Sequence, residues 1–180
     1  MPFRTAAALA LLMTLPAAAQ DAPAPAAAPA DEGQPAMIAE IKSAEGQSHG
    51  TATLSSTPSG RTLVTLDLTG LTPGIRGVHI HETGECAPPD FDSAGGHLAE
   101  GKDHGVMAET GPHPGDLPNL HVPEGGALMV EFFAAGLSPE LLGDDDGSAI
   151  VIHEQPDDYV GQPAGNAGAR IGCGTFAQAE

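Results

Sequence analysis

The segment Gly77-Val78-His79-Ile80-His81 (GVHIH, 77–81) alternates two histidines with two apolar residues. In an extended strand, residues two apart point to the same face of the sheet. Val78 and Ile80 would therefore face a core, and both imidazoles would face the other way. Taken alone, the pair favours an ordinary half-buried strand over a metal site. The rest of the chain has to decide between these two interpretations.

The segment belongs to a series of short stretches with strand character, separated by turns that contain glycine and proline. The expected strands cover residues 37–44, 50–55, 61–69, 75–81, 119–122, 127–134, 148–153 and 169–176. The one candidate helical turn is residues 138–142 (SPELL), with a serine N-cap and a proline in the first turn. This pattern predicts an all-β sandwich or barrel.

Two long gaps interrupt the strands, at residues 82–118 and 154–168, and both are rich in Gly, Pro and Asp. Loops of this length in a compact domain are usually functional or disordered. The first gap holds a group of residues whose side chains can bind metal or form disulfides: Cys86, His97, His104, His113 and Asp116.

The N-terminus has the features of a secretory signal peptide. Arg4 provides a positive charge, residues 6–15 form an apolar core too short to span a bilayer, and residues 17–19 offer a small-residue cleavage site. We expect cleavage after Ala19 and therefore an exported protein.

Residues 20–36 are rich in Pro and Ala and contain no large apolar residue, so we expect a disordered linker. Residues 37–180 then form one domain. The chain has 6 Lys and Arg against 24 Asp and Glu, and loss of Arg4 with the leader leaves a formal net charge of −19. This charge argues against nucleic acid and anionic membrane surfaces as partners. No later segment resembles a transmembrane helix.

The chain has two cysteines, Cys86 and Cys173. In an exported protein an even count favours one disulfide over two free thiols. Metal ligation is the alternative, although neither cysteine belongs to a CxxC pair.

The histidines suggest two kinds of metal chemistry. One group lies within residues 97–116, namely His97, His104, His113 and Asp116. Zinc accepts three imidazoles and one carboxylate, and a metal would cross-link a loop too polar to have its own core. The other group falls on expected strands, namely His79, His81 and His153, and imidazoles of this sort suit copper. The alternative is a solvated, histidine-rich loop that binds nothing.

The order of these motifs resembles the copper/zinc superoxide dismutase family in its bacterial exported form. The matching segments are GVHIHETGEC (77–86), SAGGH (93–97), HG (104–105), HPGDLPN (113–119), VIHEQPDD (151–158) and GNAGARIGCG (165–174). The resemblance covers residues 37–177. It implies an eight-stranded antiparallel Greek-key barrel or sandwich of immunoglobulin-like type, with two long functional loops over the metals.

The resemblance also implies a role for each matching residue. One copper, cycling between Cu(II) and Cu(I), would be bound by His79, His81, His97 and His153. One Zn(II) would be bound by His97, His104, His113 and Asp116, so that His97 bridges the two metals. The remaining matches are Asp157, which hydrogen-bonds ligands of both metals, the Cys86–Cys173 disulfide, and Arg170, which docks the anion beside copper.

The implied activity is dismutation of superoxide to dioxygen and hydrogen peroxide, as antioxidant defence in the periplasm or outside the cell. His97 would leave copper, take up a proton and return it, and Lys102 is a further candidate for attracting the anion. Monomer and homodimer both remain open. Three other functions compete with the enzyme. A copper carrier would share the metal ligands but would not need Arg170, and a catalytically silent domain of this fold would be expected to lose metal ligands. A cupredoxin electron carrier would need a cysteine thiolate as a copper ligand.

Some positions depart from the family pattern. Leu98-Ala99-Glu100 (98–100) replaces the usual phenylalanine-asparagine-proline, Val78 and Gly172 stand where other residues are commoner, and the loop after His153 is short. None of these departures removes a metal ligand. They bear instead on the catalytic rate and on the path by which the substrate reaches the metal. Two histidines, His49 and His121, match no ligand and are expected to be ordinary surface or structural residues.

Overall fold

The computed structural model describes Met1 and residues 36–179. The expected signal peptide, apart from Met1, and the expected linker, apart from residue 36, lie outside the described residues. The strands are β1 (Met37–Lys42), β2 (Ser48–Ser56), β3 (Thr62–Leu68), β4 (Gly74–Arg76), β5 (Val78–His81), β6 (Leu120–Val122), β7 (Leu128–Ala134), β8 (Ala149–His153), β9 (Arg170–Thr175) and β10 (Ala177–Gln178). The helices are η1 (Asp92–Ala94) and α1 (Pro139–Leu142).

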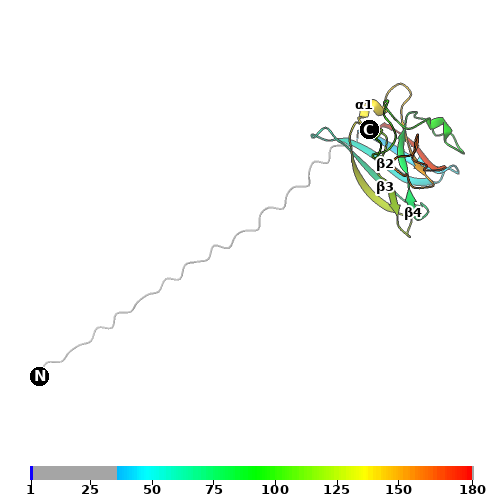
Figure 1. Cartoon of the computed structure of the whole chain (residues 1–180). Helices are drawn as coiled ribbons and strands as arrows, with labels where there is room; N and C mark the ends of the chain where they lie inside the picture. The colour runs from blue at the N-terminus through cyan, green and yellow to red at the C-terminus, as the bar shows by residue number, and fades with distance from the viewer. Residues whose placement is uncertain (2–35, 180) are drawn as a thin grey trace. The chain divides into compact units, whose positions relative to one another are not determined.

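Eight of these strands form one antiparallel sheet, which curls in space (Figure 1). Seven lie in the order β5-β8-β9-β1-β2-β3-β7, and β10 pairs with the start of β1. The step from β3 to β7 passes over three strands of the sequence, as in Greek-key connections. β4 and β6 form a separate two-stranded sheet. Along the chain, β4 is followed by β5 and β6 by β7, and β5 and β7 are the two edge strands of the large sheet. The expected antiparallel all-β fold is confirmed.

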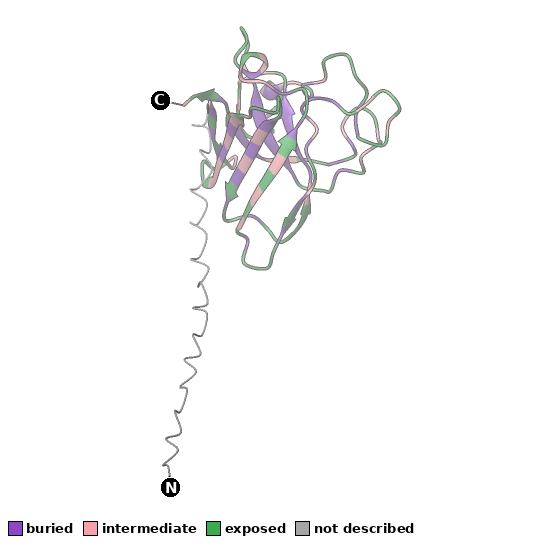
Figure 2. Cartoon of the chain, turned by 90° about the vertical axis from the view of Figure 1, so that its left-hand side faces the viewer, coloured by how far each residue is buried: buried purple, intermediate pink, exposed green. Residues whose placement is uncertain are grey.

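The strands alternate because one face of the sheet covers the core. In β3, Thr62, Val64, Leu66 and Leu68 are buried, whereas the residues between them are at least partly exposed. β1 alternates strictly between buried and exposed residues. Figure 2 shows this banding on the strands of the sheet. The apolar side chains of the inner face form one main cluster that includes Leu54, Leu66 and Ile150.

The strand expected at residues 75–81 is divided at Gly77. The first half, β4, pairs with β6, and the second half, β5, pairs with β8. Between them, the Gly77 N–H donates to Gln155 O at 2.8 Å, and its carbonyl accepts from His153 N at 2.9 Å. The chain therefore changes its pairing partner at this glycine, and β5 lies beside β8. The two-residue β10 was not expected.

The expected helical turn at residues 138–142 is confirmed. Ser138 caps α1, because its hydroxyl oxygen accepts from Leu141 N at 3.2 Å, and a proline occupies the first turn. Leu142 is buried. Within residues 36–179, the structure has no helix that is long and apolar enough to cross a membrane.

Candidate metal centre

Strands β5 and β8 carry three histidines on the outer face of the sheet. Val78 and Ile80 belong to the main core, so the alternation of β5 sends His79 and His81 outward, as expected. Both imidazoles are nonetheless buried, because loops cover this face. β8 also alternates, since Ile150 and Ile152 belong to the main core and Val151 to a small outer cluster, and its last residue, His153, is buried on the outer side beside His79. Two adjacent strands thus bring three imidazoles together.

The first long loop, residues 82–119, runs along the outer edge of β5. His97 forms a β-bridge with His81, and Asp116 forms one with His79. The carbonyl of Ile80 accepts a hydrogen bond from the loop at 2.9 Å. These backbone contacts fix the His97 imidazole and the Asp116 carboxylate beside the strand histidines.

Each strand histidine donates one ring N–H to a fixed acceptor. His79 Nε2 lies 2.8 Å from Asp157 Oδ2, His81 Nδ1 lies 3.0 Å from the Gly95 carbonyl, and His153 Nδ1 lies 3.3 Å from the Gly168 carbonyl. A neutral imidazole that donates from one nitrogen has a lone pair on the other. This arrangement is typical of metal-binding histidines.

The nitrogens that remain are buried and have no hydrogen-bond partner among the described residues. They are His79 Nδ1, His81 Nε2, His97 Nε2 and His153 Nε2. These four residues also offer ligand atoms that lie within 4.8 Å of one another. Burying a polar atom without a partner costs free energy. A metal ion bound by imidazoles would satisfy all four nitrogens, so the residues present fit such an ion.

A second group converges on a single carboxylate oxygen. The atoms that lie close to Asp116 Oδ1 are His97 Nδ1 at 3.2 Å, His104 Nδ1 at 3.0 Å and His113 Nδ1 at 3.2 Å. Two of these rings donate from Nε2 elsewhere, His104 to Asp157 Oδ1 at 3.0 Å and His113 to the Lys102 carbonyl at 3.1 Å. Three imidazoles and one carboxylate form the ligand set that zinc accepts.

By distance alone, His79 rather than His113 falls into the second group, with His97, His104 and Asp116. However, His79 Nε2 already faces Asp157, so its one remaining nitrogen belongs to the first group. His113 Nδ1 is directed at Asp116 and has no such competing use. By their hydrogen bonds, His79 therefore belongs with the first group and His113 with the second.

His97 differs from the other five histidines of the site. Its Nδ1 lies against Asp116, whereas its Nε2 belongs to the first group and has no acceptor in the described structure. Its ring stacks on His79 with centroids 4.0 Å apart. His97 alone therefore directs one nitrogen to each group.

Asp157 joins the two groups from the second long loop, residues 154–169. One of its carboxylate oxygens accepts from His79 and the other from His104. The loop also passes over this pair at Gly165, which has a φ of +63°. A Cβ at Gly165 would collide with Asp157 Oδ1 and would lie 2.6 Å from His104 Nε2, so only glycine fits.

Burial lowers the histidine pKa values at the first group. The pKa of His81 falls to about 2, because burial disfavours the charged ring and His97 lies nearby. The pKa of His153 falls to about 3, and that of His97 to about 4, with burial again the largest cause. These imidazoles are neutral at pH 7, which is the form that binds metal.

The two carboxylates have lowered pKa values despite burial. Burial would raise the pKa of Asp157, but hydrogen bonds from His79 and His104 outweigh it and bring the value to about 2. For Asp116, hydrogen bonds from His97 and the Gly105 backbone likewise outweigh burial and lower the pKa. Both carboxylates are therefore ionised at neutral pH.

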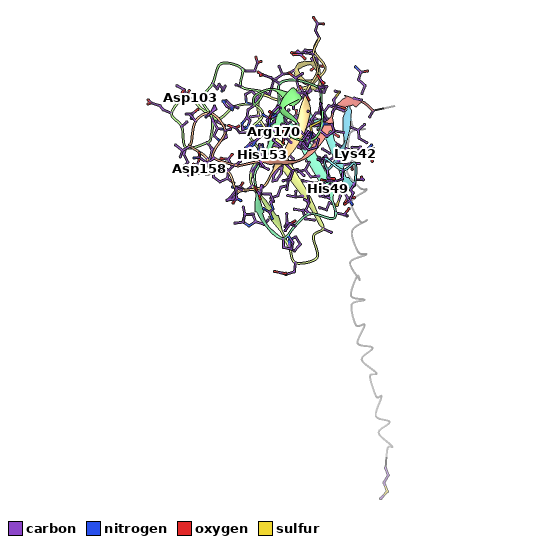
Figure 3. All side chains as sticks on the ribbon, turned by 90° about the vertical axis from the view of Figure 1, so that its right-hand side faces the viewer. Lys42, His49, Asp103, His153, Asp158 and Arg170 are labelled. Atoms are coloured by element: carbon purple, nitrogen blue, oxygen red, sulfur yellow. A yellow bond between two sulfur atoms is a disulfide. The ribbon has the colours of Figure 1, made fainter. Side chains whose placement is uncertain are left out.

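Arg170 lies directly opposite His153 in the β8–β9 pairing, and the two are adjacent in Figure 3. Its guanidinium donates to the carbonyls of Phe91 at 2.7 Å and Gly95 at 2.8 Å. The Gly95 carbonyl also accepts from His81. The positive group is thus held beside two histidines of the first group, and Arg170 as a whole is half-buried.

Cys86 and Cys173 form a disulfide, with their Cα atoms 5.7 Å apart. It joins the first loop to β9, three residues beyond Arg170. Phe91 and Ala94 of the loop pack with Cys173 in a small apolar cluster on the outer face of the sheet. The disulfide therefore fixes the loop segment whose carbonyls hold Arg170.

The other sequence candidates lie elsewhere. His49 is on β2, with Nδ1 3.2 Å from the Thr69 carbonyl, and it lies apart from His153 in Figure 3. His121 is exposed on β6. Lys102 is an exposed loop residue whose carbonyl, but not its ammonium group, contacts the site through His113.

Sequence reasoning missed two amide side chains, Asn119 and Gln162. Each hydrogen-bonds the backbone of a site residue from the opposite loop, Asn119 to Asp157 and Gln162 to His104. Asn119 is the last residue of a matched motif, which was its one sequence signal. Gln162 had none, because its contact depends on how the loops fold over each other.

A family model described as copper/zinc superoxide dismutase (SODC) matches residues 48–176. A Cu-Zn superoxide dismutase of Caulobacter vibrioides is 42% identical over 147 residues, which cover 77% of this chain and 83% of the relative. One from Aquifex aeolicus is 43% identical over 145 residues, covering 77% and 84%.

Solved structures agree with these relatives. A superoxide dismutase-like protein of Bacillus subtilis has a TM-score of 0.73 at 39% identity, covering 77% of this chain and 96% of its own. The Cu/Zn superoxide dismutase of Brucella abortus has a TM-score of 0.63 at 28% identity, covering 77% and 97%. The family implies an oxidoreductase with one copper and one zinc, for which the two histidine groups are suited. By sequence, by fold and by these donor sets, the chain belongs to the copper/zinc superoxide dismutase family.

Proposed function

We propose that this chain dismutates superoxide, converting two superoxide ions and two protons into one dioxygen and one hydrogen peroxide. The observation that carries the proposal is the His97 ring, which directs one nitrogen to each donor group. The other five histidines each use one nitrogen on a fixed acceptor and keep one for a metal.

The chemistry of the two donor sets supports one metal assignment. Copper would be held by the four unpartnered nitrogens, those of His79, His81, His97 and His153. Zinc would be held by the group around the carboxylate, namely His97, His104, His113 and Asp116. Bound copper supplies one-electron redox chemistry between Cu(II) and Cu(I).

The protein side of the reaction is proton handling and anion docking. His97 can hold a proton at Nε2 and give it to the peroxide product, because its Nδ1 stays directed at the zinc group. Arg170 uses two N–H groups on backbone carbonyls, and a guanidinium has five. The remaining donors can form charge-assisted hydrogen bonds with superoxide.

Metal analysis together with a dismutation assay on the purified mature protein tests the proposal. We expect one copper and one zinc per chain and rapid dismutation. Both metals without turnover would instead indicate a copper carrier. Loss of dismutation when copper alone is removed, and its return with added copper, would assign the redox role to that metal.

We also propose that the chain acts in the periplasm, in defence against superoxide. The N-terminal sequence and the Cys86–Cys173 disulfide support export to an oxidising compartment. Fractionation of cells that express the full chain should place the enzyme, shortened after Ala19, with periplasmic markers. An uncleaved chain in the cytoplasmic fraction would contradict this proposal.

Asp157→Asn should weaken zinc binding about tenfold, because an amide oxygen can replace the carboxylate towards only one of the two histidines, His79 and His104. The measurement is competition for zinc with a chelator of known affinity. Asp158→Asn is the matched control, since that carboxylate is exposed and bonds only to its own loop. Equal zinc affinities in the two variants would contradict a linking role for Asp157.

Lys102→Ala should change the ionic-strength dependence of the rate while lowering the rate at most about twofold, because an exposed charge steers an anion only through its screened field. The measurement is the dismutation rate against salt concentration. Lys42→Ala is the control, because Lys42 is already paired with Glu40 at 2.8 Å on β1. Identical salt profiles for both variants would show that Lys102 is merely solvated.

A further inference from the structure

The side chain of Gln162 holds the backbone of His104 on both sides. Its Oε1 accepts from His104 N at 2.9 Å, and its Nε2 donates to the His104 carbonyl at 2.9 Å. The same Nε2 also donates to the Val160 carbonyl at 3.1 Å, which fixes the amide within its own loop. One side chain of the second loop thus binds both peptide groups of one residue in the first loop.

These two hydrogen bonds satisfy both backbone polar groups of His104. His104 is completely buried, and within residues 36–179 its N–H and carbonyl have no backbone partner. Buried peptide groups are nearly always hydrogen-bonded, because leaving them unpaired is costly. A primary amide offers a donor and an acceptor side by side, so it can satisfy both groups at once.

A second amide makes the reciprocal contact. Asn119, at the end of the first loop, donates from Nδ2 to the Asp157 carbonyl and accepts at Oδ1 from Asp157 N, both at 2.8 Å. The side chains of Asp157 and His104 are themselves hydrogen-bonded. The two loops are therefore joined by two amides, each holding one partner of this pair.

The two amides hold different parts of the site. Asp157 contacts both His79 of the first group and His104 of the second, so Asn119 supports both groups. Among the residues of the two groups, Gln162 hydrogen-bonds only His104, through its backbone, and His104 Nδ1 lies in the Asp116 group. Its influence should therefore fall mainly on that group, because it reaches the first group only indirectly, through the His104–Asp157 hydrogen bond.

We propose that Gln162 is a positioning residue for zinc: it acts through the backbone of His104 and retains the metal by keeping that ligand and its loop in place. This inference rests on the proposed function, which assigns His104 to zinc. Without the amide, the His104 segment would open more readily, because both of its peptide groups would then favour water over the buried position.

The test measures the rate at which zinc leaves the full mature protein for a colorimetric chelator, and in parallel the rate at which copper leaves. Gln162→Leu removes both bonds to His104 and should release zinc about thirtyfold faster, the effect of two net hydrogen bonds. Gln162→Glu keeps the acceptor but loses the donors and should release it about tenfold faster. Copper release should change less than twofold in both.

Gln155→Leu is the matched control, because this glutamine is exposed in the same loop and, among the described residues, forms hydrogen bonds through its backbone but none through its side-chain amide. It should release zinc at the parent rate. Asn119→Ala provides the contrast and should accelerate the release of both metals, since it frees Asp157.

The possible outcomes separate this inference from the proposed function. If the parent retains zinc and dismutates superoxide, but Gln162→Leu releases zinc no faster than Gln155→Leu, the positioning role is wrong and the function stands. If Gln162→Leu accelerates copper and zinc release equally, Gln162 is a general packing residue, and the inference is again overturned. If the parent binds no zinc, both the inference and the proposed function fail.

Discussion

Arg170→Ala should bind one copper and one zinc like the parent and should dismutate superoxide about 100-fold more slowly. The guanidinium lies opposite His153 and is fixed by the carbonyls of Phe91 and Gly95, so its free donors have a defined direction. Hydrogen bonds to a charged group are each worth about 1.5–3 kcal/mol, and the upper value corresponds to about two orders of magnitude. The measurement is the second-order rate of dismutation on protein of known metal content.

Two variants separate docking from other effects. Arg170→Lys keeps the charge but loses the planar fork, and it should recover part of the rate. Arg61→Ala removes one positive charge from an exposed turn and should match the parent, which controls for the change in net charge. Unchanged turnover in Arg170→Ala, with both metals present, would refute the docking role.

The double variant Cys86→Ser/Cys173→Ser should lose about 4–5 kcal/mol of unfolding free energy. The disulfide joins residues 87 positions apart, and in the chain-entropy model a loop of that length stabilises a fold by roughly this amount. For a domain of this size, the melting temperature should fall by about 10–15 °C. The measurement is thermal unfolding of the metal-free proteins, so that metal release does not distort the transition.

A matched reference comes from the parent protein itself. Parent protein kept under reducing conditions should melt close to the double variant, whereas oxidised parent should melt higher. If the double variant and the oxidised parent melt within about 2 °C of each other, the disulfide does not stabilise the fold as this argument requires.

Strands and helical turns could be predicted where the pattern of neighbouring residues determines their bounds. β3 alternates across Thr62–Leu68, and Ser138 with the following proline defines α1, so both could be identified from neighbouring residues. The division of the strand at Gly77 could not, because it depends on pairing with β6 on one side and β8 on the other. The two-residue β10 is too short to carry a pattern.

In the site too, some features follow from local sequence pattern and others only from the tertiary fold. The H-x-H spacing alone predicts that His79 and His81 share a face, and the structure bears this out. The meeting of His97 with both donor groups requires the first loop to run along β5, which no local pattern encodes. Gln162 is 58 positions from His104 in sequence, so its contact becomes visible only in the folded chain.

The course of the first loop along β5 has a consequence for solubility. Ile80 donates to Gly115 O at 2.8 Å and accepts from Leu98 N at 2.9 Å, so the loop completes the outer edge of an end strand. An uncovered edge strand is a template for pairing between molecules. The segments that cover it also carry His97 and Asp116, and a chain that lost its metals would hold this cover less firmly. Metal loading should therefore also protect the protein against aggregation.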